Sequence, residues 1–596
     1  MPPDVYYKER IAILQQELQK LLQKKNSLGW LRFAVVALLI ASIYFLLPIG
    51  WLYVIVAVII LLIAFTRLLF TDLSNKSAIE NTRRLITINE DEVKALAHNY
   101  YDFADGLEHL PKEHLYANDL DIFGRASLFQ YVNRTGSEMG STELAKWLLQ
   151  PANTNTLLQR QTTIKELTAA TEWRQQLQAF AKEKKIQTAT RQRLQQWLSE
   201  TNQFSSQKYW GVLRYILPAI ILTIIALNIA GLIPYQVRNM AILLFAVIAY
   251  FFAKKAAPVH IHLSKMVSEL EVLADSVELI EKKVFKSELL VQMQAQFLQK
   301  KYTSSKVLKE LKTILERLDL RYNPVAFIPL AILFQWDLQQ VLSLEKWKQQ
   351  HHENVPLWFD MLAQFEALSS LATVSFNHPE WCFPVFKEPH FSIEGRQIGH
   401  PLINTDKRVN NDITIDHIGE IMLITGSNMA GKSTYLRSIG VNTVLAMAGA
   451  PVCADSFTLS PVQIISSMRI ADNLEESTST FYAELKKLKT VIDLVNEGAK
   501  VFILLDEILR GTNSLDRHTG SVALLKQLIK KHAAAIIATH DVELAKLKET
   551  YPENILNYHF DAQVSNDELY FDYKLKTGVC ESLNASILMK KIGIEL

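Results

Sequence analysis

The chain has 596 residues, which is too long for a single hydrophobic core and predicts several domains. Its 63 Lys and Arg residues against 61 Asp and Glu residues leave a formal charge of +2, which excludes the global basic surface of a dedicated nucleic-acid binder. The three cysteines, Cys382, Cys453 and Cys580, lack metal-ligand or redox spacing, so we expect free thiols in a reducing compartment.

The first thirty residues predict an amphipathic helix rather than a cleavable signal peptide, because they are charged and rich in Gln. Ile11, Leu14, Leu18 and Leu21 recur at spacings of three and four. This spacing fits a seam for a partner helix or, more commonly, a surface helix that packs on its own chain.

Two long apolar stretches, residues 33–65 and 215–253, predict two transmembrane helical hairpins. A single helix over the first stretch would be about 50 Å long, whereas a bilayer core is about 30 Å thick. Pro48 and Gly50 supply a turn in the middle, and the second stretch breaks around residues 234–239. Each stretch is therefore expected to cross the membrane twice.

Cations flank both hairpins, and Arg238 is the single charged residue in their connecting turns. The positive-inside rule then predicts a multi-pass protein of the cell (inner) membrane with its soluble domains in the cytoplasm. Two pairs of buried core helices are the alternative, although core helices rarely run so far without a charge. Because no Asp, Glu, Lys or His lies within the spans and the one Arg is in a turn, we interpret them as anchors and not as an ion pathway.

The remaining sequence has a helical pattern at first and then alternates between strand-like and helical segments. Residues 119–200 have a helical pattern, and residues 260–348 predict long amphipathic helices with solvated charged faces. From about Ser369 onward, short apolar runs alternate with helical stretches, which is typical of a sheet flanked by helices.

A phosphate-binding loop is the strongest chemical signal. The stretch IMLITGSNMAGKSTYLRSIG (residues 421–440) fits the pattern G-x-x-x-x-G-K-S/T between a strand-like run and a helical one. Glycines let the backbone wrap a phosphate, Lys432 would reach the β- and γ-phosphates, and Ser433 would ligate Mg²⁺. We therefore expect ATP and Mg²⁺ as cofactors, bound by Gly426, Ser427, Asn428, Met429, Ala430, Gly431, Lys432 and Ser433.

Two further strand ends carry polar residues that suit this chemistry. The run 501–505 ends in Asp506, a candidate for the metal shell, and Glu507, a candidate general base for the attacking water. Ile536 and Ile537 lead to His540, which is placed to sense the γ-phosphate. The three elements together predict an ATPase.

The sequences of these motifs resemble the ATPase domain of the MutS family of DNA mismatch-repair proteins. The resemblance is carried by TGSNMAGKSTYLR, DEILRGTNSLD and ATHDVEL, by GRQIGHPLI and VNND ahead of the loop, and by STSTFYAEL and GVCESLNASILMKKIGI after it. Residues 119–151 are similar to the family's core domain, from which lever helices rise. The similarity covers roughly residues 119–200 and 260–596.

The resemblance implies roles for single residues at the positions that match the family's motifs. It implies phosphate and Mg²⁺ binding by the loop together with Thr434, a metal-shell role for Asp506, general-base catalysis by Glu507, a switch role for His540 and a nucleotide contact by Asn411. It also implies that Ser479 reaches the γ-phosphate bound to an opposite subunit, with Asp516 at the same interface. A homodimer with composite ATP sites, whose closure moves the levers, is the expected assembly.

The chain departs from the family pattern in several places. Ser427 replaces the usual proline, Leu509 and Ser477 stand where glycines are usual, and Arg408 stands where an aromatic ring commonly stacks on adenine. Little precedes residue 119 that corresponds to the mismatch-reading and connector domains. The second hairpin falls where the family inserts its DNA-gripping clamp, so we expect the levers to end in lipid.

The predicted fold is multidomain: an α-helical core and lever domain with two transmembrane helical hairpins, followed by an α/β P-loop ATPase domain of the ABC type. The predicted segments are the N-terminal helix 1–30, hairpin 31–67, connecting segment 68–118, core and levers 119–345 interrupted by hairpin 215–253, and ATPase domain 346–596. The predicted function is a membrane-anchored MutS-like ATPase that acts in DNA binding or repair, with lipid as a partner and DNA left open. The alternative is a DNA-independent mechanochemical ATPase of the membrane, or an ATP-dependent scaffold.

Overall fold

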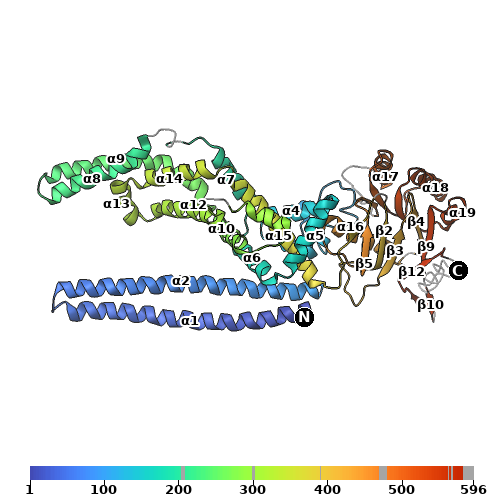
Figure 1. Ribbon diagram of the computed structural model, residues 1–596, viewed down its shortest axis with the longest axis horizontal. Coiled ribbons are helices and arrows are strands. Elements are labelled where there is room, and N and C mark those ends of the chain that lie inside the picture. Colours follow the sequence, from blue (N-terminus) through green and yellow to red (C-terminus); the bar gives the residue numbers. More distant parts are fainter. Residues whose placement is uncertain are drawn as a thin grey trace. The chain divides into compact units, whose positions relative to one another are not determined.

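The computed structural model in Figure 1 describes residues 1–202, 204, 209–298, 302–388, 391–427, 429–468, 480–561, 563–565 and 568–580. The protein is multidomain and forms two compact units. The unit that we call the sheet unit comprises Met1–Arg134, Leu144–Ala179 and Leu368–Leu596, and the unit that we call the helical unit comprises Thr135–Glu143 and Phe180–Ala367.

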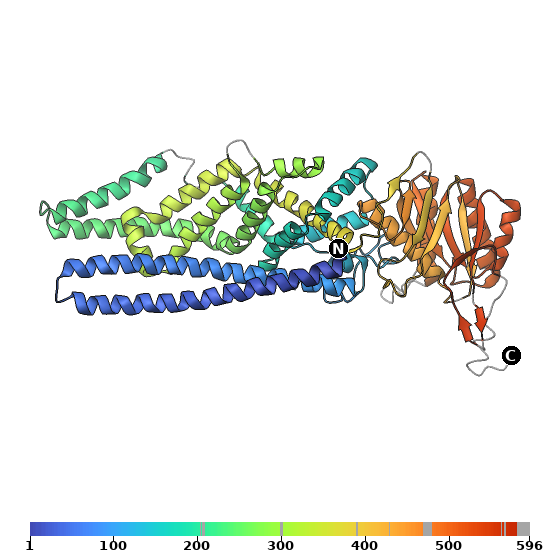
Figure 2. The ribbon, with the colours of Figure 1, turned by 60° about the horizontal axis from the view of Figure 1, so that its bottom comes forward.

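The sheet unit begins with two long helices, α1 (Pro3–Leu46) and α2 (Trp51–Leu96), which lie side by side in both views (Figures 1 and 2). A short turn that contains Pro48 and Gly50 separates them, as the sequence predicts. The boundaries at the outer ends differ from the prediction. The N-terminal helix and the first apolar span form one continuous helix, and α2 continues through much of the expected connecting segment, because no proline interrupts either helix interior.

The N-terminal seam finds its partner within the chain. Leu14 is buried in a cluster with Leu85, Ile88 and Ala179, and Ile11 packs against that cluster. The hairpin is therefore tied to its own unit at its open end by apolar contacts.

Four helices in the described part of the chain are long and apolar enough to cross a membrane. Two are α1 and α2, and the other two are α8 (Tyr209–Ile229) and α9 (Tyr235–Ser264) of the helical unit. The turn between α8 and α9 lies slightly before the predicted break. Asn228 donates a hydrogen bond across it to the Ile233 carbonyl over 3.0 Å, and Arg238 donates to the Asn228 side chain over 3.1 Å. The single cation of the turn thus has a partner.

The other helices are shorter and alternate with loops. Their bounds are η1 Leu107–His109, α3 Leu128–Val132, α4 Glu138–Leu149, α5 Thr154–Thr168, α6 Thr171–Glu183, α7 Thr188–Ser199, α10 Val267–Lys282, α11 Glu288–Ala295, α12 Ser304–Asp319, η2 Leu320–Tyr322, α13 Pro324–Phe334, α14 Trp336–His351 and α15 Val355–Asn377. Helices α10 and α12 pack closely through apolar faces, while Lys309 and Lys312 bind acidic side chains of α10. This arrangement matches the amphipathic, solvated pattern of the sequence.

The C-terminal region is an α/β structure. Its strands are β1 Val385–Phe386, β2 Ile393–Ile398, β3 Asn411–Ile415, β4 Ile421–Gly426, β5 Ser456–Leu459, β6 Gln463–Ser467, β7 Val501–Asp506, β8 Ala534–Thr539, β9 Ile555–Phe560, β10 Gln563–Ser565, β11 Glu568–Tyr570 and β12 Leu575–Thr577. The helical elements among them are α16 Lys432–Ala448, α17 Thr480–Asn496, α18 Ser514–Lys530, η3 Val542–Lys546 and α19 Leu547–Thr550.

The main sheet has six strands in the order β12-β9-β4-β8-β7-β6, and only β12 is antiparallel to its neighbour. Strands β4, β7 and β8 are buried along their whole length, as parallel strands covered on both faces must be. A second sheet, β1-β5-β2-β3, and the small β10-β11 ribbon complete the region. Because β4, β8 and β7 are adjacent and parallel, their carboxyl ends lie at one edge.

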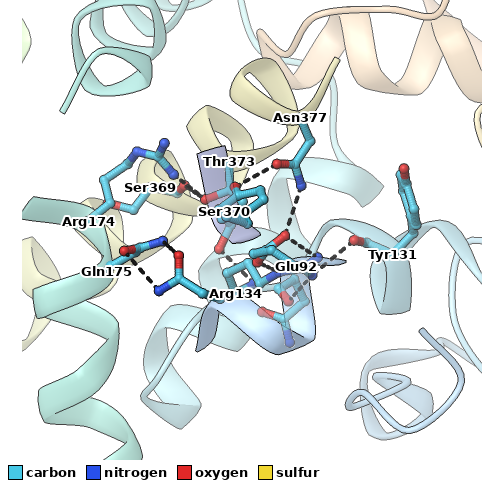
Figure 3. A network of polar contacts seen from close by, with 12 residues as sticks. Glu92, Tyr131, Arg134, Arg174, Gln175, Ser369, Ser370, Thr373 and Asn377 are labelled. Atoms are coloured by element: carbon cyan, nitrogen blue, oxygen red, sulfur yellow. Dashed lines mark hydrogen bonds and ion pairs between the residues drawn. The ribbon is translucent and has the colours of Figure 1, made fainter. Parts of the chain in front are cut away.

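A buried polar network joins the N-terminal helices to the rest of the sheet unit (Figure 3). Glu92 of α2 forms an ion pair with Arg134, and Asn377 at the end of α15 donates to the Glu92 carboxylate over 2.8 Å. Tyr7 of α1 donates in turn to the Asn377 side chain over 2.7 Å. The Arg134 backbone amide donates to the Ser370 hydroxyl over 3.0 Å, so four separate segments meet here.

Candidate functional site

The candidate site lies at the carboxyl edge of the main sheet. Gly426 ends β4, Asp506 ends β7 and Thr539 ends β8, with Thr425 paired to Thr539 and Asp506 paired to Ala538. The three motifs that the sequence singles out are therefore neighbours in space, although more than a hundred residues separate the first from the last.

The loop after β4 needs glycine at two positions. Gly426 has φ +151°, and a Cβ there would lie 2.7 Å from the Phe560 carbonyl oxygen. Gly431 has φ +106° and precedes the first turn of α16. The free amides at the start of this 17-residue helix are directed at the loop, and the helix dipole favours an anion there. Asn428 lies outside the described residues, and the neighbouring Met429 is strongly exposed.

Lys432 is nearly buried, with 4% of its surface exposed. Its ammonium group donates to the carbonyl oxygens of Gly426 and Ser427 over 2.8 and 3.0 Å, so the loop closes over it. Burial lowers the pKa of Lys432, and the nearby carboxylates of Asp506 and Glu507 oppose that shift. Ser433 and Thr434 are exposed at the mouth of the same loop.

Glu507 is held by two cationic or protonated partners. His540 Nε2 lies 2.6 Å from Glu507 Oε1, and Arg510 Nε lies 2.8 Å from Oε2. Because an ionised carboxylate only accepts hydrogen bonds, His540 Nε2 carries the proton and donates it. The approach of Lys432 Nζ to this nitrogen, 3.4 Å, is then a contact between two donors and not a hydrogen bond.

This hydrogen bond from His540 is the main cause that lowers the pKa of Glu507, and Arg510 and Lys432 lower it further. The Glu507 side chain is therefore ionised at neutral pH. A carboxylate in that state can accept a proton from water.

Asp506 is buried beside Glu507 and provides the best candidate metal ligand. Its Oδ1 atom has no hydrogen-bond partner among the described residues. No cluster of three or more His, Cys, Asp or Glu side chains suited to a metal occurs in the described ranges. Mg²⁺ commonly uses one or two protein ligands together with phosphate oxygens and water, so an unpartnered Asp506 oxygen and the Ser433 hydroxyl fit that ion bound with a nucleotide.

A cavity of about 370 Å³ opens beside the loop. It is lined by the loop residues, Glu507, Asn411, Arg408 and Tyr573, among others. The Asn411 side chain is engaged by backbone, since it donates to the Tyr573 carbonyl over 3.0 Å and accepts from the Leu575 amide over 2.8 Å. In this arrangement Asn411 fixes the position of Tyr573 in the cavity wall.

The structure shows how the chain accommodates one departure from the family pattern. Leu509, where the family usually has glycine, adopts φ +61°, a conformation that glycine takes without strain. The buried Glu484 carboxylate accepts hydrogen bonds from the backbone amides of Leu509 and Arg510, the second over 3.2 Å. These bonds hold the segment after Glu507 in its unusual conformation.

Of the two residues that the sequence predicts at a dimer interface, Asp516 lies within the described residues and Ser479 does not. Ser479 lies outside the described residues, as does Ser477. Asp516 lies in the first turn of α18, where its amide donates to the Asn513 side chain over 2.9 Å and its carboxylate accepts from Asn513 over 2.7 Å. Asn513 thus caps α18, and the Asp516 carboxylate binds the side chain of that cap.

Sequence reasoning missed three residues of the site: Arg510, Tyr573 and Glu484. Arg510 lies inside the motif DEILRGTNSLD, and an Arg three residues after a candidate base is a signal for an ion pair when the segment turns back on itself. Tyr573 lies far from the motifs in sequence, and no local pattern predicts that it reaches the loop. Its ring would lie 3.1 Å from a Cβ at Gly431.

Comparison with known proteins places this site in context. Residues 422–591 match the model of MutS domain V. The DNA mismatch repair protein MutS of Thermotoga maritima is 32% identical over 239 residues, which is 39% of this chain and 29% of that protein. MutS protein homolog 4 of Mus musculus is 34% identical over 200 residues, 32% of this chain and 20% of that protein. The chain thus matches about three tenths or less of the length of these relatives.

Proposed function

We propose a function from the premise that this chain belongs to the MutS family through its C-terminal domain, residues 422–591. The chain is a membrane-anchored, mismatch-repair-type ATPase that binds ATP with Mg²⁺ at the carboxyl edge of the main sheet. It acts as a homodimer that couples ATP turnover to motion of its helices, in association with DNA or a DNA-repair partner at the membrane.

The observation that carries the proposal is the meeting of Lys432, Asp506, Glu507 and His540 at three adjacent strand ends. These groups come from separate motifs, and their convergence supplies a buried cation, an unpartnered carboxylate oxygen and an ionised base within one site. A glycine-rich turn without a binding role would not be expected to have these three groups beside it.

Each residue has a distinct task in the proposed turnover. The loop amides and Lys432 bind the β- and γ-phosphates, and Lys432 exchanges its carbonyl partners Gly426 and Ser427 for phosphate oxygens. Ser433 and Asp506 hold Mg²⁺, which neutralises charge on the phosphates when it is bound. Glu507 orients the attacking water and accepts its proton, and His540 moves from Glu507 toward the γ-phosphate.

Membrane anchoring is supported by the character of α1, α2, α8 and α9. Their apolar stretches carry no acidic, Lys or His side chain and leave large apolar side chains exposed, a surface that water does not favour. Lys and Arg residues gather at the open ends of both hairpins, which supports soluble domains in the cytoplasm of a cell (inner) membrane.

A second candidate function is a DNA-independent mechanochemical ATPase that acts on membrane or envelope components. It is favoured by one feature: the apolar stretches of α8 and α9, which occupy the place of the family's DNA clamp in chain order, present exposed Leu, Val and Phe, and their Lys residues lie beyond Ala253. Phosphate backbone binding needs Lys and Arg in that position.

ATP turnover measured on the purified chain in four conditions separates the two functions: alone, with duplex or branched DNA, with lipid vesicles, and with both. The DNA-associated function predicts stimulation by DNA that falls steeply with salt concentration. Stimulation by vesicles with indifference to DNA would instead establish the second function. No Mg²⁺-dependent turnover in any condition would contradict both.

A further inference from the structure

A third strongly apolar segment lies in the helical unit, outside both hairpins. Residues 322–336, with the sequence YNPVAFIPLAILFQW, contain no charged side chain. Most of them form α13, in which Pro324 occupies the first turn and Pro329 lies inside the helix. At about 1.5 Å per residue, its 11 residues reach roughly 16 Å, about half of a bilayer core.

Polar contacts tie both ends of α13 to the final apolar turns of α9. Before α13, Arg321 donates to the Ala253 carbonyl over 3.1 Å and pairs with the buried Asp337 over 2.7 Å. After it, Gln335 donates to the Phe245 carbonyl over 3.3 Å. The helix therefore lies against the stretch of α9 between Phe245 and Ala253, just ahead of the cations Lys254 and Lys255.

The outer side of α13 is left uncovered by the described residues of the helical unit. Val325 is 86% exposed, and Ile328 and Phe334 are also exposed. The neighbouring helix α9 also exposes apolar side chains, such as Leu243 and Val247. Tyr322 and Trp336 stand at the two ends, where amphipathic rings commonly mark a membrane interface.

Helix α14 does not continue α13 across the membrane. The two helices meet at a bend of 79°, where Gln335 adopts φ +50°. Charged residues of α14 have partners in the protein: Glu345 accepts from the Phe204 amide over 3.1 Å, and Lys348 donates to the Glu200 carbonyl over 2.6 Å. An apolar segment that enters and returns on the same side describes α13 better than one half of a span.

We propose that α13 is a third membrane-embedded element, a short re-entrant helix that packs on α8 and α9 and inserts its exposed face into the acyl chains of the cytoplasmic leaflet. The inference rests on the proposed membrane anchoring through α8 and α9. It adds to that function a wedge that would displace lipid next to the second hairpin. Its partner is the hydrocarbon of the bilayer and not another protein.

Site-directed spin labelling of the full chain in phospholipid vesicles tests this. Labels are placed one at a time through Val325→Cys, Leu243→Cys and Val284→Cys, after Cys382, Cys453 and Cys580 are replaced by serine. Val284 is the matched control, because it is a valine of the same unit with nearly the same exposure, 84%, in the loop after α10. Leu243, 66% exposed on α9, reports on the hairpin itself.

The proposal predicts that labels at residues 325 and 243 collide more often with dissolved oxygen than with a water-soluble nickel complex, and that this ratio inverts at residue 284. A label at residue 325 that behaves like the one at residue 284, or that is shielded from both reagents, would overturn the proposal while leaving the anchor intact. A water-like result at residue 243 would instead overturn the anchoring itself, and α13 with it.

A second measurement avoids substitutions. The unaltered chain is placed in vesicles that contain a phospholipid with a diazirine in its acyl chain, irradiated, and digested for mass spectrometry. Lipid adducts should occur on peptides from residues 322–336 and from α9, and be absent from residues 283–287. Adducts on α9 alone would overturn the proposal.

Discussion

Replacing Glu507 by Gln is expected to lower the rate constant of ATP turnover by about 10²–10⁴-fold while leaving ATP binding nearly unchanged. The amide keeps the size of the side chain and can still accept a hydrogen bond from His540, which lies 2.6 Å from Glu507 Oε1. It cannot accept a proton from water. The measurement is single-turnover hydrolysis of radiolabelled ATP by the purified chain with Mg²⁺, alongside equilibrium ATP binding.

The matched control is Glu543→Gln, a Glu-to-Gln change in the same domain at an exposed position where the carboxylate pairs with Lys546. It should leave turnover unchanged. Equal rates for the natural chain and Glu507→Gln would mean that Glu507 is not the base, and they would favour an ATP-dependent scaffold instead.

Replacing Glu92 by Ala is expected to destabilise the junction between α2 and the rest of the sheet unit by about 3–5 kcal/mol. Burial alone would lower the pKa of Arg134, but the Glu92 carboxylate raises it above its ordinary value, so the guanidinium is charged inside the protein. Without Glu92 that charge stays buried and loses its counter-ion, and Asn377 loses its acceptor. Figure 3 shows how these groups converge.

Amide hydrogen exchange over residues 85–96 measures this effect locally, because a chain with several domains does not unfold in one step. The exchange rate there should rise by about 10²–10⁴-fold in Glu92→Ala, because each 1.36 kcal/mol is about a tenfold change. Glu80→Ala is the control on the same helix, since Glu80 forms an exposed ion pair with Arg83 that is worth little. Equal exchange in the two variants would contradict the role of the buried pair.

Much of the candidate site is predictable from sequence because its motifs are local and their chemistry is restrictive. A loop that wraps a phosphate needs glycines at Gly426 and Gly431, and a buried strand that ends in two carboxylates is conspicuous. Adjacent parallel strands then bring the motifs to one edge. The apolar hairpins can also be predicted from sequence, because composition and length are enough to identify helices that could cross a membrane.

Other features depend on contacts that no local pattern encodes. Tyr573 is held beside the loop by Asn411, which bonds the Tyr573 carbonyl and the Leu575 amide. Helix α13 is easily overlooked, since it is too short for a span and its two prolines suggest a loop. The bounds of α1 and α2 exceed the apolar stretches because their polar halves continue the same helices and pack on the sheet unit.

Flotation of the purified chain on a density gradient, with phospholipid vesicles, Mg²⁺ and a fluorescent non-hydrolysable ATP analogue, tests the central claim most directly. The account predicts that chain and nucleotide rise together into the lipid fraction, and that Lys432→Ala removes the nucleotide without sinking the chain. A chain that stays in the aqueous fraction without detergent, or that floats without retaining nucleotide, would contradict it.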